Sequence, residues 1–507
     1  MSFRFVDLFA GIGGFHAALS SLGGECVYAV EIDEQAARVY EANWGRPGGR
    51  PVRGDITLDA DEEDGVMNVP PHDVLCAGFP CQPFSKSGAQ RGMDEARGTL
   101  FFNIMSIVRA HHPSVVLLEN VRNLAGPRHE HEWDIIVRSL REEGYHVSGE
   151  PAVFSPHLLP AWMGGSPQVR ERVFITATYA PGLVPLLGDG RVDVLARGPE
   201  PVASMKSRFP RTPTSDKSDH FVPGDADRGW NLLASGVLDD ATADPSCELT
   251  VTEKLWIDAW DEFVVIMRER TGKQLKGFPY WADSWLDFPE VAGLFRGILP
   301  TPVADPETGR FTALAEMDPA VLPSRVTRPS VERSLPAWKQ SHLRKNYEMF
   351  ADHWEILIPW AYRWGIFTSL FPSSRRKLEW QAQDADRLWS TVMHLRPSGI
   401  RAKRPTYVPA LVAITQTSIV GPLERRLSPR ETARLQGLSD DFSFAGQPAR
   451  ATYKQMGNGV SVGAVRHVFL AHVERDRALV DDCLRHVHAA SRDHTPGLDF
   501  VTRATER

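Results

Sequence analysis

Cysteine is scarce in this chain of 507 residues. Five are present, an odd number, at positions 26, 76, 81, 247 and 483. No two of them have the CxxC spacing, and no arrangement matches a zinc site or a framework of disulfides. The scarcity predicts a protein of a reducing, intracellular compartment without a structural metal.

Long apolar runs are also missing. The most apolar stretch, residues 354–371, is interrupted by Glu355 and Arg363, which makes it a poor transmembrane span. Near the N-terminus, Asp7 stands where a signal peptide would need an unbroken apolar run. We therefore expect a cytoplasmic protein with no membrane partner.

Positive charge is in short supply over the whole chain, but not locally. The 57 Lys and Arg residues are outnumbered by 64 Asp and Glu, giving a net charge of −7, so a nucleic acid would have to be held by a local basic surface. Residues 231–320 carry 7 basic and 16 acidic side chains, whereas residues 321–430 carry 18 and 8. The basic segment, which includes Arg344 and Lys345, is interleaved with histidine and tryptophan. It is a candidate phosphate-binding surface, with an ordinary solvated face as the alternative.

The composition is globular, and the first 178 residues alternate between short apolar runs and helical patterns. With 42% hydrophobic and 24% charged residues, wholesale disorder is excluded, and the length suffices for about three domains. Strands are predicted at 3–8, 25–30, 73–77 and 115–118, each ending in a polar or glycine-rich turn. Such runs suit strands that are covered on both faces. Helix starts are predicted at a capping box of Thr250 with Glu253 and at the Ser-Pro-Arg-Glu segment 428–431, the second helix ending at Gly437. We expect an α/β fold with a doubly wound, Rossmann-like, mostly parallel sheet.

A glycine turn follows the first predicted strand, Glu31 follows the second, and Asp55 closes a third strand–turn in the segment Gly54–Thr57. The segment 7–15 reads DLFAGIGGF, and the free N–H groups of a helix that starts there could hold an anion. The dinucleotide fingerprint fails because His16 stands where a glycine is needed. Glu31 could accept the hydroxyls of a ribose, and Asp55 an adenine amino group. Together they indicate an adenosine-bearing ligand without a pyrophosphate, the alternative being three ordinary polar strand ends.

A candidate nucleophile and a candidate acid follow two later strands. Cys81 lies between Pro80 and Pro83 on a strand-end loop, which holds it rigidly at the carboxyl edge of the sheet. Glu119 ends the next strand and would face the same pocket. A further strand is predicted to open at Gln168. Its two-residue period places three hydrogen-bond donors on one face, Gln168, Arg170 and Arg172. The alternative is a solvent-facing edge.

At this point the chain resembles a known family, the cytosine-C5 DNA methyltransferases of bacterial restriction-modification or phage-defence systems. Beyond the motifs above, three segments match the family in order: Arg97–Phe101, Arg426–Gly437 and Gly457–Val462. The resemblance covers about 1–178 and 425–475. It implies a catalytic S-adenosylmethionine-binding domain whose first part is 1–178, a small target-recognition domain with a large insertion at 179–448, and a return to the catalytic domain at 449–507.

The resemblance also implies a mechanism and a set of site residues. Cys81 would add to C6 of a flipped-out cytosine, Glu119 would donate a proton to N3, and Arg170 and Arg172 would orient the base. The cofactor S-adenosylmethionine would be held by Phe9, Gly11, Gly13, Glu31, Asp55, Ile56, Pro80, Leu100 and Asn458. A lid at 82–98 would close over the base. The residues expected to contact DNA are Ser85, Lys86, Arg97, Arg344 and Lys345.

Double-stranded DNA is thus the expected partner, and a monomer is the expected form. A cognate restriction endonuclease or another defence component is a candidate companion. Two alternatives stay open: an RNA cytosine-C5 methyltransferase, and a catalytically silent DNA-binding regulator. The large insertion favours DNA over RNA, and the presence of Cys81, Glu119 and the arginine pair disfavours the silent regulator.

Overall fold

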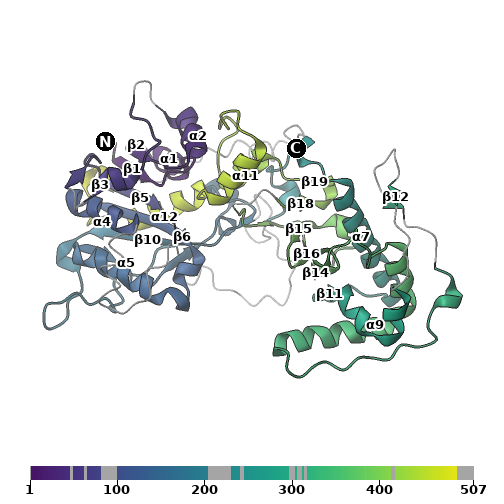
Figure 1. The fold of residues 1–507 in the computed structure, drawn as a ribbon. Helices are drawn as coiled ribbons and strands as arrows, with labels where there is room; N and C mark the ends of the chain where they lie inside the picture. The colour runs from purple at the N-terminus through teal and green to yellow at the C-terminus, as the bar shows by residue number, and fades with distance from the viewer. Residues whose placement is uncertain are drawn as a thin grey trace. The chain divides into compact units, whose positions relative to one another are not determined.

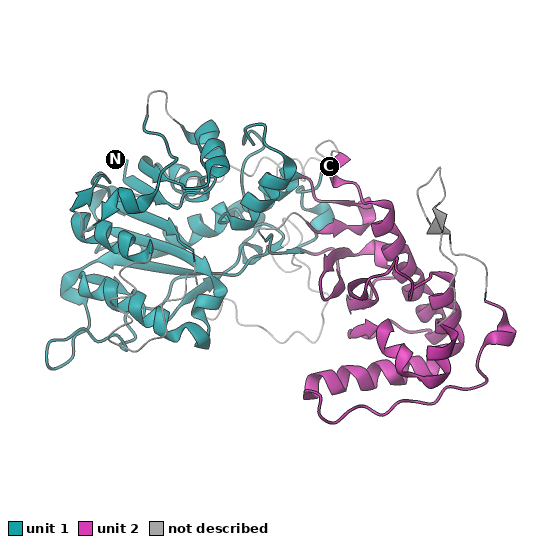
Figure 2. Cartoon of the chain, viewed as in Figure 1, with its two compact units in different colours: residues 1–242, 407–416, 429–507 teal, residues 243–406, 417–428 magenta. Residues whose placement is uncertain are grey.

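The computed structural model describes nine ranges of the chain with their side chains: 2–45, 49–61, 65–80, 100–203, 230–239, 245–295, 317–382, 384–412 and 417–487. It describes the backbone alone at 303–304 and 311–312. Two compact units are present (Figure 2). Unit 1 comprises residues 1–242, 407–416 and 429–507, and unit 2 comprises 243–406 and 417–428.

Unit 1 is built on a seven-stranded sheet (Figure 1). The strand order is β2 (Glu25–Val30), β1 (Arg4–Leu8), β5 (Val74–Gly78), β6 (Val115–Val121), β10 (Arg172–Tyr179) and β7 (Tyr145–Val147), with β8 (Ala152–Phe154) paired to β10. The first four are parallel, and β10 pairs antiparallel with its neighbours. All four predicted strands are therefore confirmed, within one to three residues at their ends, as is the α/β class.

Helices cover both faces of this sheet because its strands are apolar on both sides. The side chains of α4 (Leu100–His111) and α5 (Glu130–Glu142) share one core with Val6, Leu8 and the alternate residues of the neighbouring strands. On the opposite face, α1 (Gly14–Ser20) and α12 (Val462–Arg475) lie against each other, and Phe469 packs on Phe3. The helix α2 (Glu34–Trp44) follows β2, and a small hairpin pairs β3 (Ala60–Asp61) with β4 (Val66–Met67).

The C-terminal part of the chain returns to unit 1. It supplies α10 (Pro429–Gln436), α11 (Ala449–Asn458), α12 and α13 (Asp482–Arg485). The helix expected at the Ser-Pro-Arg-Glu segment does begin with proline, and Gly437, with φ of +81°, follows its last residue.

The continuous strand predicted from Gln168 was wrong. A two-residue strand, β9 (Gln168–Val169), pairs with β17 (Val408–Pro409), and β10 begins at Arg172. Between them, the Arg170 N–H donates to Ser155 Oγ at 2.9 Å instead of to a neighbouring strand. The ladder is interrupted there, so the two-residue period does not carry from Gln168 to Arg172.

Unit 2 has its own sheet and its own core. The order is β11 (Pro279–Trp281), β14 (Lys377–Gln381), β16 (Gly399–Lys403), β15 (Val392–Arg396), β18 (Ile419–Val420) and β19 (Arg425–Arg426). One face packs on α7 (Val251–Thr271), α8 (Pro289–Leu294) and α9 (Ala337–Arg363) through four fully buried tryptophans: Trp260, Trp285, Trp360 and Trp380. The predicted capping box of Thr250 and Glu253 is confirmed at the start of α7. A separate pair joins β12 (Val303–Ala304) and β13 (Phe311–Thr312).

Within the described ranges, no helix combines the length and the apolar character that crossing a membrane requires.

Candidate active site

The turn between β1 and α1 is fixed by two glycines in the left-handed region. Gly11 has φ of +55° and Gly13 has φ of +90°. A Cβ atom on Gly13 would lie 2.2 Å from Trp44 Nε1, whose N–H donates to the Ile12 carbonyl at 3.2 Å. Only glycine therefore fits at Gly13, and α2 braces the turn through the Trp44 indole.

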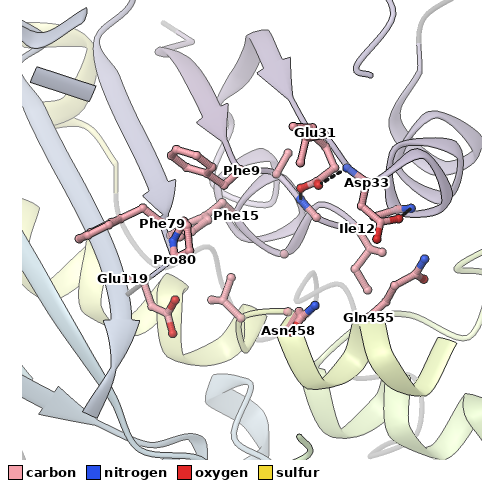
Figure 3. Close-up of a pocket in the computed structure, with 18 of the residues that line it drawn as sticks. Phe9, Ile12, Phe15, Glu31, Asp33, Phe79, Pro80, Glu119, Gln455 and Asn458 are labelled. Carbon is pink, nitrogen blue, oxygen red and sulfur yellow. Dashed lines mark hydrogen bonds between the residues drawn. The ribbon is translucent and has the colours of Figure 1, made fainter. Parts of the chain in front are cut away.

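The carboxylate of Glu31 faces the same turn and is held by two backbone donors. Gly11 N–H donates to Oε2 at 2.8 Å, and Asp33 N–H donates to Oε1 at 2.7 Å (Figure 3). Asp55 is held in a similar way, because its Oδ1 accepts from the Thr57 N–H at 3.0 Å and from the Thr57 hydroxyl at 2.8 Å. Both carboxylates are thus fixed before any ligand arrives.

A cavity of about 450 Å³ joins these carboxylates to the end of β6. All the residues that line it belong to unit 1. They include ten of the residues expected at the site: Phe9, Gly11, Glu31, Asp55, Ile56, Pro80, Leu100, Glu119, Arg172 and Asn458 (Figure 3). Segments from both ends of the chain therefore meet around one space.

Glu119 is a buried acid at the inner end of this cavity. It stands opposite Gly78 on β5, three residues before Cys81, and its Oε1 lies 2.9 Å from Arg172 Nε. Burial raises the pKa of Glu119, while the positive charges of Arg172 and Arg170 oppose the shift. The carboxyl group is consequently biased toward its protonated, proton-donating form.

The two arginines expected to act together have different partners. Arg172 lines the cavity beside Glu119. Arg170 is 1% exposed, and its guanidinium donates to the carbonyl oxygens of Leu411, at 2.8 Å, of Gly457, at 2.9 Å, and of Gly459. Burial, and to a smaller extent the charge of Arg172, lowers the pKa of Arg170 to about 9. Arg170 therefore ties down the turn that carries Asn458.

The loop that leads to the candidate nucleophile is braced by Asn120, as the sequence suggested. Its side-chain amide donates to the Phe79 carbonyl at 3.0 Å, and it is 3% exposed. Cys81 itself lies outside the described residues, as do the lid at 82–98 and three expected DNA contacts: Ser85, Lys86 and Arg97.

Two further groups of expected residues do not line the cavity. Gly13 packs against Trp44 instead of lining the space. Arg344 and Lys345 are exposed on α9 of unit 2.

Sequence reasoning missed several residues that line the cavity. Asp33 caps α2 and accepts from Lys454 Nζ on α11 at 3.1 Å. Phe15 and Phe79 form part of its apolar wall, with Ile12 and Val460, and Gln455 also lines the space. An aspartate directly before a helical pattern is a signal for a helix cap, so the role of Asp33 could have been predicted. No local pattern in the sequence points to Lys454, its partner 421 residues away.

The parallel sheet, the glycine turn after β1, Glu31 after β2 and Asp55 at the start of the turn Ile56–Leu58 define an α/β fold of the S-adenosylmethionine-dependent methyltransferase kind. The family model for C-5 cytosine-specific DNA methylase matches residues 3–474. The chain belongs to this family, and it is a DNA (cytosine-5-)-methyltransferase, of a family that generally uses S-adenosylmethionine.

Individual relatives agree with the family model. Type II methyltransferase M.AluI from Cellulosimicrobium cellulans is 60% identical over 491 residues, which cover 94% of this chain and 93% of that protein. Type II methyltransferase M.HhaI from Haemophilus parahaemolyticus is 45% identical over 172 residues, which cover 34% of this chain and 48% of that protein. Among solved structures, the S. pombe Dnmt2 methyltransferase overlaps with a TM-score of 0.38 at 14% identity, over 93% of this chain and 99% of that chain, a likeness too low to bear on the fold.

Proposed function

We propose that this chain methylates C5 of a flipped-out cytosine in a specific double-stranded DNA sequence, through a covalent bond between Cys81 and C6. The observation that carries the proposal is the position of Glu119. It is a buried acid with a raised pKa, on the strand beside the one that leads to Cys81, and it opens into a cavity lined by ligand-binding carboxylates.

The residues of the cavity fit S-adenosylmethionine. Glu31, fixed by two backbone donors, suits the ribose hydroxyls, and the described part of the chain leaves Asp55 Oδ2 without a hydrogen bond, so that it could receive the adenine amino group. The aromatic ring of Phe9 offers a stacking surface, and the backbone at Gly11 and Asn458 borders the remainder. Apart from the proton donor Glu119, three carboxylates line the space against one lysine and one arginine, which favours a cationic sulfonium: Glu31, Asp33 and Asp55. When bound, this cofactor supplies an electrophilic methyl group.

The chain's own residues make C5 of cytosine nucleophilic. The thiolate of Cys81 forms a bond to C6 as Glu119 donates its proton to N3, so no negative charge remains on the ring. Arg172, beside Glu119, holds the base in place from the same side. After C5 has gained the methyl group, it loses its proton to a base and the bond from C6 to Cys81 breaks to release the thiolate. N3 then returns its proton to Glu119, which restores the neutral base and the acid.

Recognition of the DNA is assigned to unit 2, within the predicted 179–448 segment. Its exposed Arg344 and Lys345 would bind phosphates, as would Ser85, Lys86 and Arg97 from the lid. The target base must leave the stack because C5 and C6 are inaccessible in a duplex. The similarity to Type II methyltransferases supports host DNA protection, alongside a cognate restriction endonuclease, as the biological role.

The test is base-resolution sequencing of 5-methylcytosine in DNA from a methylation-free bacterial host that expresses the chain. We expect methylation within one short sequence, none with Cys81→Ser, and a rate lowered by about 10²- to 10⁴-fold with Glu119→Gln, because general acid catalysis is worth roughly that much. Each variant should keep its affinity for S-adenosylhomocysteine. Full methylation by Cys81→Ser would refute the mechanism, and unmethylated DNA from the wild type would refute the function.

A further inference from the structure

The sheet of unit 2 has one apolar face and one charged face. The apolar face supplies Leu378, Trp380, Ile400, Ala402, Met393 and Leu395 to the core. Since side chains alternate along a strand, the residues between them point the other way. On this second face the register places a basic and aromatic set side by side: Trp281, Lys377, Glu379, His394, Arg396, Arg401 and Lys403. We call this set the charged face.

The charged face carries more positive charge than its one carboxylate, that of Glu379, can neutralise. Glu379 is the one acid of the set, against two lysines and two arginines. Burial, then the charges of Arg401 and Arg396, lowers the pKa of Lys403. His394 is kept neutral, since burial and four nearby cations lower its pKa to about 4. Crowding half-buried like charges in this way destabilises the unit, and a bound polyanion would relieve the repulsion.

Glu379 holds two of the arginines in fixed positions at one end of the charged face. Its Oε2 accepts from Arg401 Nε at 2.8 Å and lies 3.4 Å from Arg396 Nη1, while its Oε1 accepts from the Ser398 hydroxyl at 3.0 Å. Arg396 and Ser398 belong to the tight turn between β15 and β16. The two arginine side chains remain 40% and 33% exposed, whereas that of Glu379 is 12% exposed.

The geometry leaves the outer edge of Arg401 available. Glu379 Oε2 engages Nε and Nη2, both at 2.8 Å, and the described residues provide no partner for Nη1. A guanidinium held along one edge presents a forked pair of N–H groups from the other. That fork matches the O6 and N7 acceptors of guanine in the major groove of DNA.

We infer that the charged face of unit 2 contacts the DNA major groove, that Arg401 and Arg396 recognise guanine there, and that Glu379 positions them. The inference rests on the proposed function and names the surface that sets the sequence specificity. By contrast, Arg344 and Lys345 lie exposed on one side of α9 beside Glu348, as on an ordinary solvated helix. They would add phosphate contacts that act alike on every sequence.

The experiment compares methylation profiles of Arg401→Gln, Arg401→Lys, Arg396→Gln and Glu379→Gln with that of the wild type. For each variant, 5-methylcytosine sequencing gives the preference at every position of the target. We expect Arg401→Gln to lower discrimination at one guanine position by roughly tenfold to a hundredfold, the range for one bidentate contact. Arg401→Lys should lower it too, because lysine keeps the charge but loses the fork. Glu379→Gln should weaken the preference at that same position.

Arg270→Gln is the matched control, because Arg270 is an exposed arginine on α7 that pairs with Glu355 at 3.5 Å. It should keep the wild-type profile. Circular dichroism and thermal unfolding check that unit 2 of each variant is folded, because this unit has a core of its own. If both Arg401 variants and Arg396→Gln keep the wild-type preference at every position, the inference is wrong. A wild type that leaves no methylation would instead overturn the proposed function.

Discussion

Arg170 and Arg172 are separated by one residue, but they act on different parts of the site. Arg172 pairs with the buried acid Glu119. Arg170 satisfies three carbonyl oxygens in segments that lie 241 to 289 residues further along the chain. A buried guanidinium with several donors is suited to such a role, since each carbonyl would otherwise be left without a partner. Arg170 thus ties down segments that border the cavity, and Arg172 lines the cavity beside Glu119.

Substitution by lysine should separate these roles. Arg170→Lys removes the planar fork that holds the Gly457 and Gly459 carbonyls, so we expect the Kd for S-adenosylhomocysteine to rise about tenfold, with a smaller change in kcat at saturating cofactor. Arg172→Lys should lower kcat about tenfold or more and leave that Kd unchanged. Calorimetric titration and steady-state kinetics measure the two quantities. Equal effects of both variants on kcat, with no change in affinity, would contradict the division.

At the same scale, residue type and position were enough to predict that Glu31, Asp55 and Glu119 lie together, and the structure has all three lining one cavity. Glu31 and Glu119 lie at the carboxyl ends of parallel strands, which meet at one edge of the sheet, whereas Asp55 caps the short turn Ile56–Leu58 and no described strand ends at it. The direction of Arg170 could not be predicted, because its partners are backbone atoms distant in sequence and its strand is interrupted. Lys454 was missed for the same reason: its partner Asp33 is brought near only by the complete fold.

At the scale of elements, the turn into α1 depends on glycine more strictly than its φ angle requires. Gly13 and Gly23 have nearly equal φ angles, +90° and +87°, but the space around them differs. A Cβ atom at Gly13 would collide with Trp44, whereas among the described residues, apart from the two chain neighbours, none has an atom within 4 Å of a Cβ at Gly23. Substituting each of these two glycines therefore separates the effect of backbone strain, present at both, from that of steric crowding, present only at Gly13.

We therefore expect Gly23→Ala to destabilise the protein by about 1–2 kcal/mol, the cost of a left-handed alanine, and to leave cofactor binding intact. Gly13→Ala should cost more and should weaken S-adenosylhomocysteine binding at least tenfold, because Trp44 must move away from the turn. Urea unfolding and calorimetric titration provide the measurements. Indistinguishable results for the two variants would show that the contact with Trp44 is unimportant.

The packing of α12 on β10 makes stability depend on pH through His472. This histidine is fully buried and lies 2.9 Å from the Thr178 hydroxyl. Burial, then the charge of Arg475, lowers its pKa to about 3. Because the pKa of His472 is lower in the folded protein than its ordinary value of 6.5, the unfolded chain binds the proton more readily. The stability contributed by neutral His472 is therefore present above pH 6.5 and is lost as the pH falls toward 3.

His472→Asn keeps a polar group near Thr178 but does not titrate. We expect the variant to be less stable than the wild type at pH 7.5, and the difference to shrink at pH 5.5 by about 1 kcal/mol, since the linkage is worth at most about 1.4 kcal/mol per pH unit. Guanidinium unfolding at the two pH values measures this. A difference that is constant with pH would mean that His472 is not held neutral.

Elements of unit 1 were easier to predict than those of unit 2. The strands β1, β2, β5 and β6 are continuous apolar runs, which is what a sheet covered on both faces requires. In unit 2 only α7, marked by its capping box, was foreseen. The sheet there joins strands as far apart as β11 and β19, each with few residues, and tryptophans spread over the whole segment make one core. Contacts of that kind leave no local period in the sequence.

For the whole molecule, the net charge of −7 is a poor guide to its partner. The opposite charges of residues 231–320 and 321–430 nearly cancel in the sum, and some of them pair directly, as Arg363 does with Glu262 and Arg387 with Asp261. The charged face keeps an excess of cations, because Glu379 is the one acid in that set. Binding of DNA should accordingly fall steeply with salt, despite the acidic average.

The two units should also be distinguishable in thermal unfolding, because each has its own core. Every residue that lines the cofactor cavity belongs to unit 1, so a ligand of that cavity stabilises unit 1 directly. At a concentration of 100 Kd, S-adenosylhomocysteine should add about 2.7 kcal/mol to the stability of unit 1. In scanning calorimetry we expect two transitions, of which this ligand raises one and leaves the other in place.

Two substitutions, one in each unit, assign the two transitions to the units. Gly13→Ala should lower only the transition that the ligand raises, and Arg387→Gln, which breaks the ion pair of Arg387 with the buried Asp261 in unit 2, should lower only the other. A cognate DNA duplex would then raise the second transition if unit 2 binds it, and that shift should be lost with Arg401→Gln. One transition that moves as a whole with every ligand and variant would mean instead that the two units unfold together, and that the cavity and the charged face are coupled through folding itself.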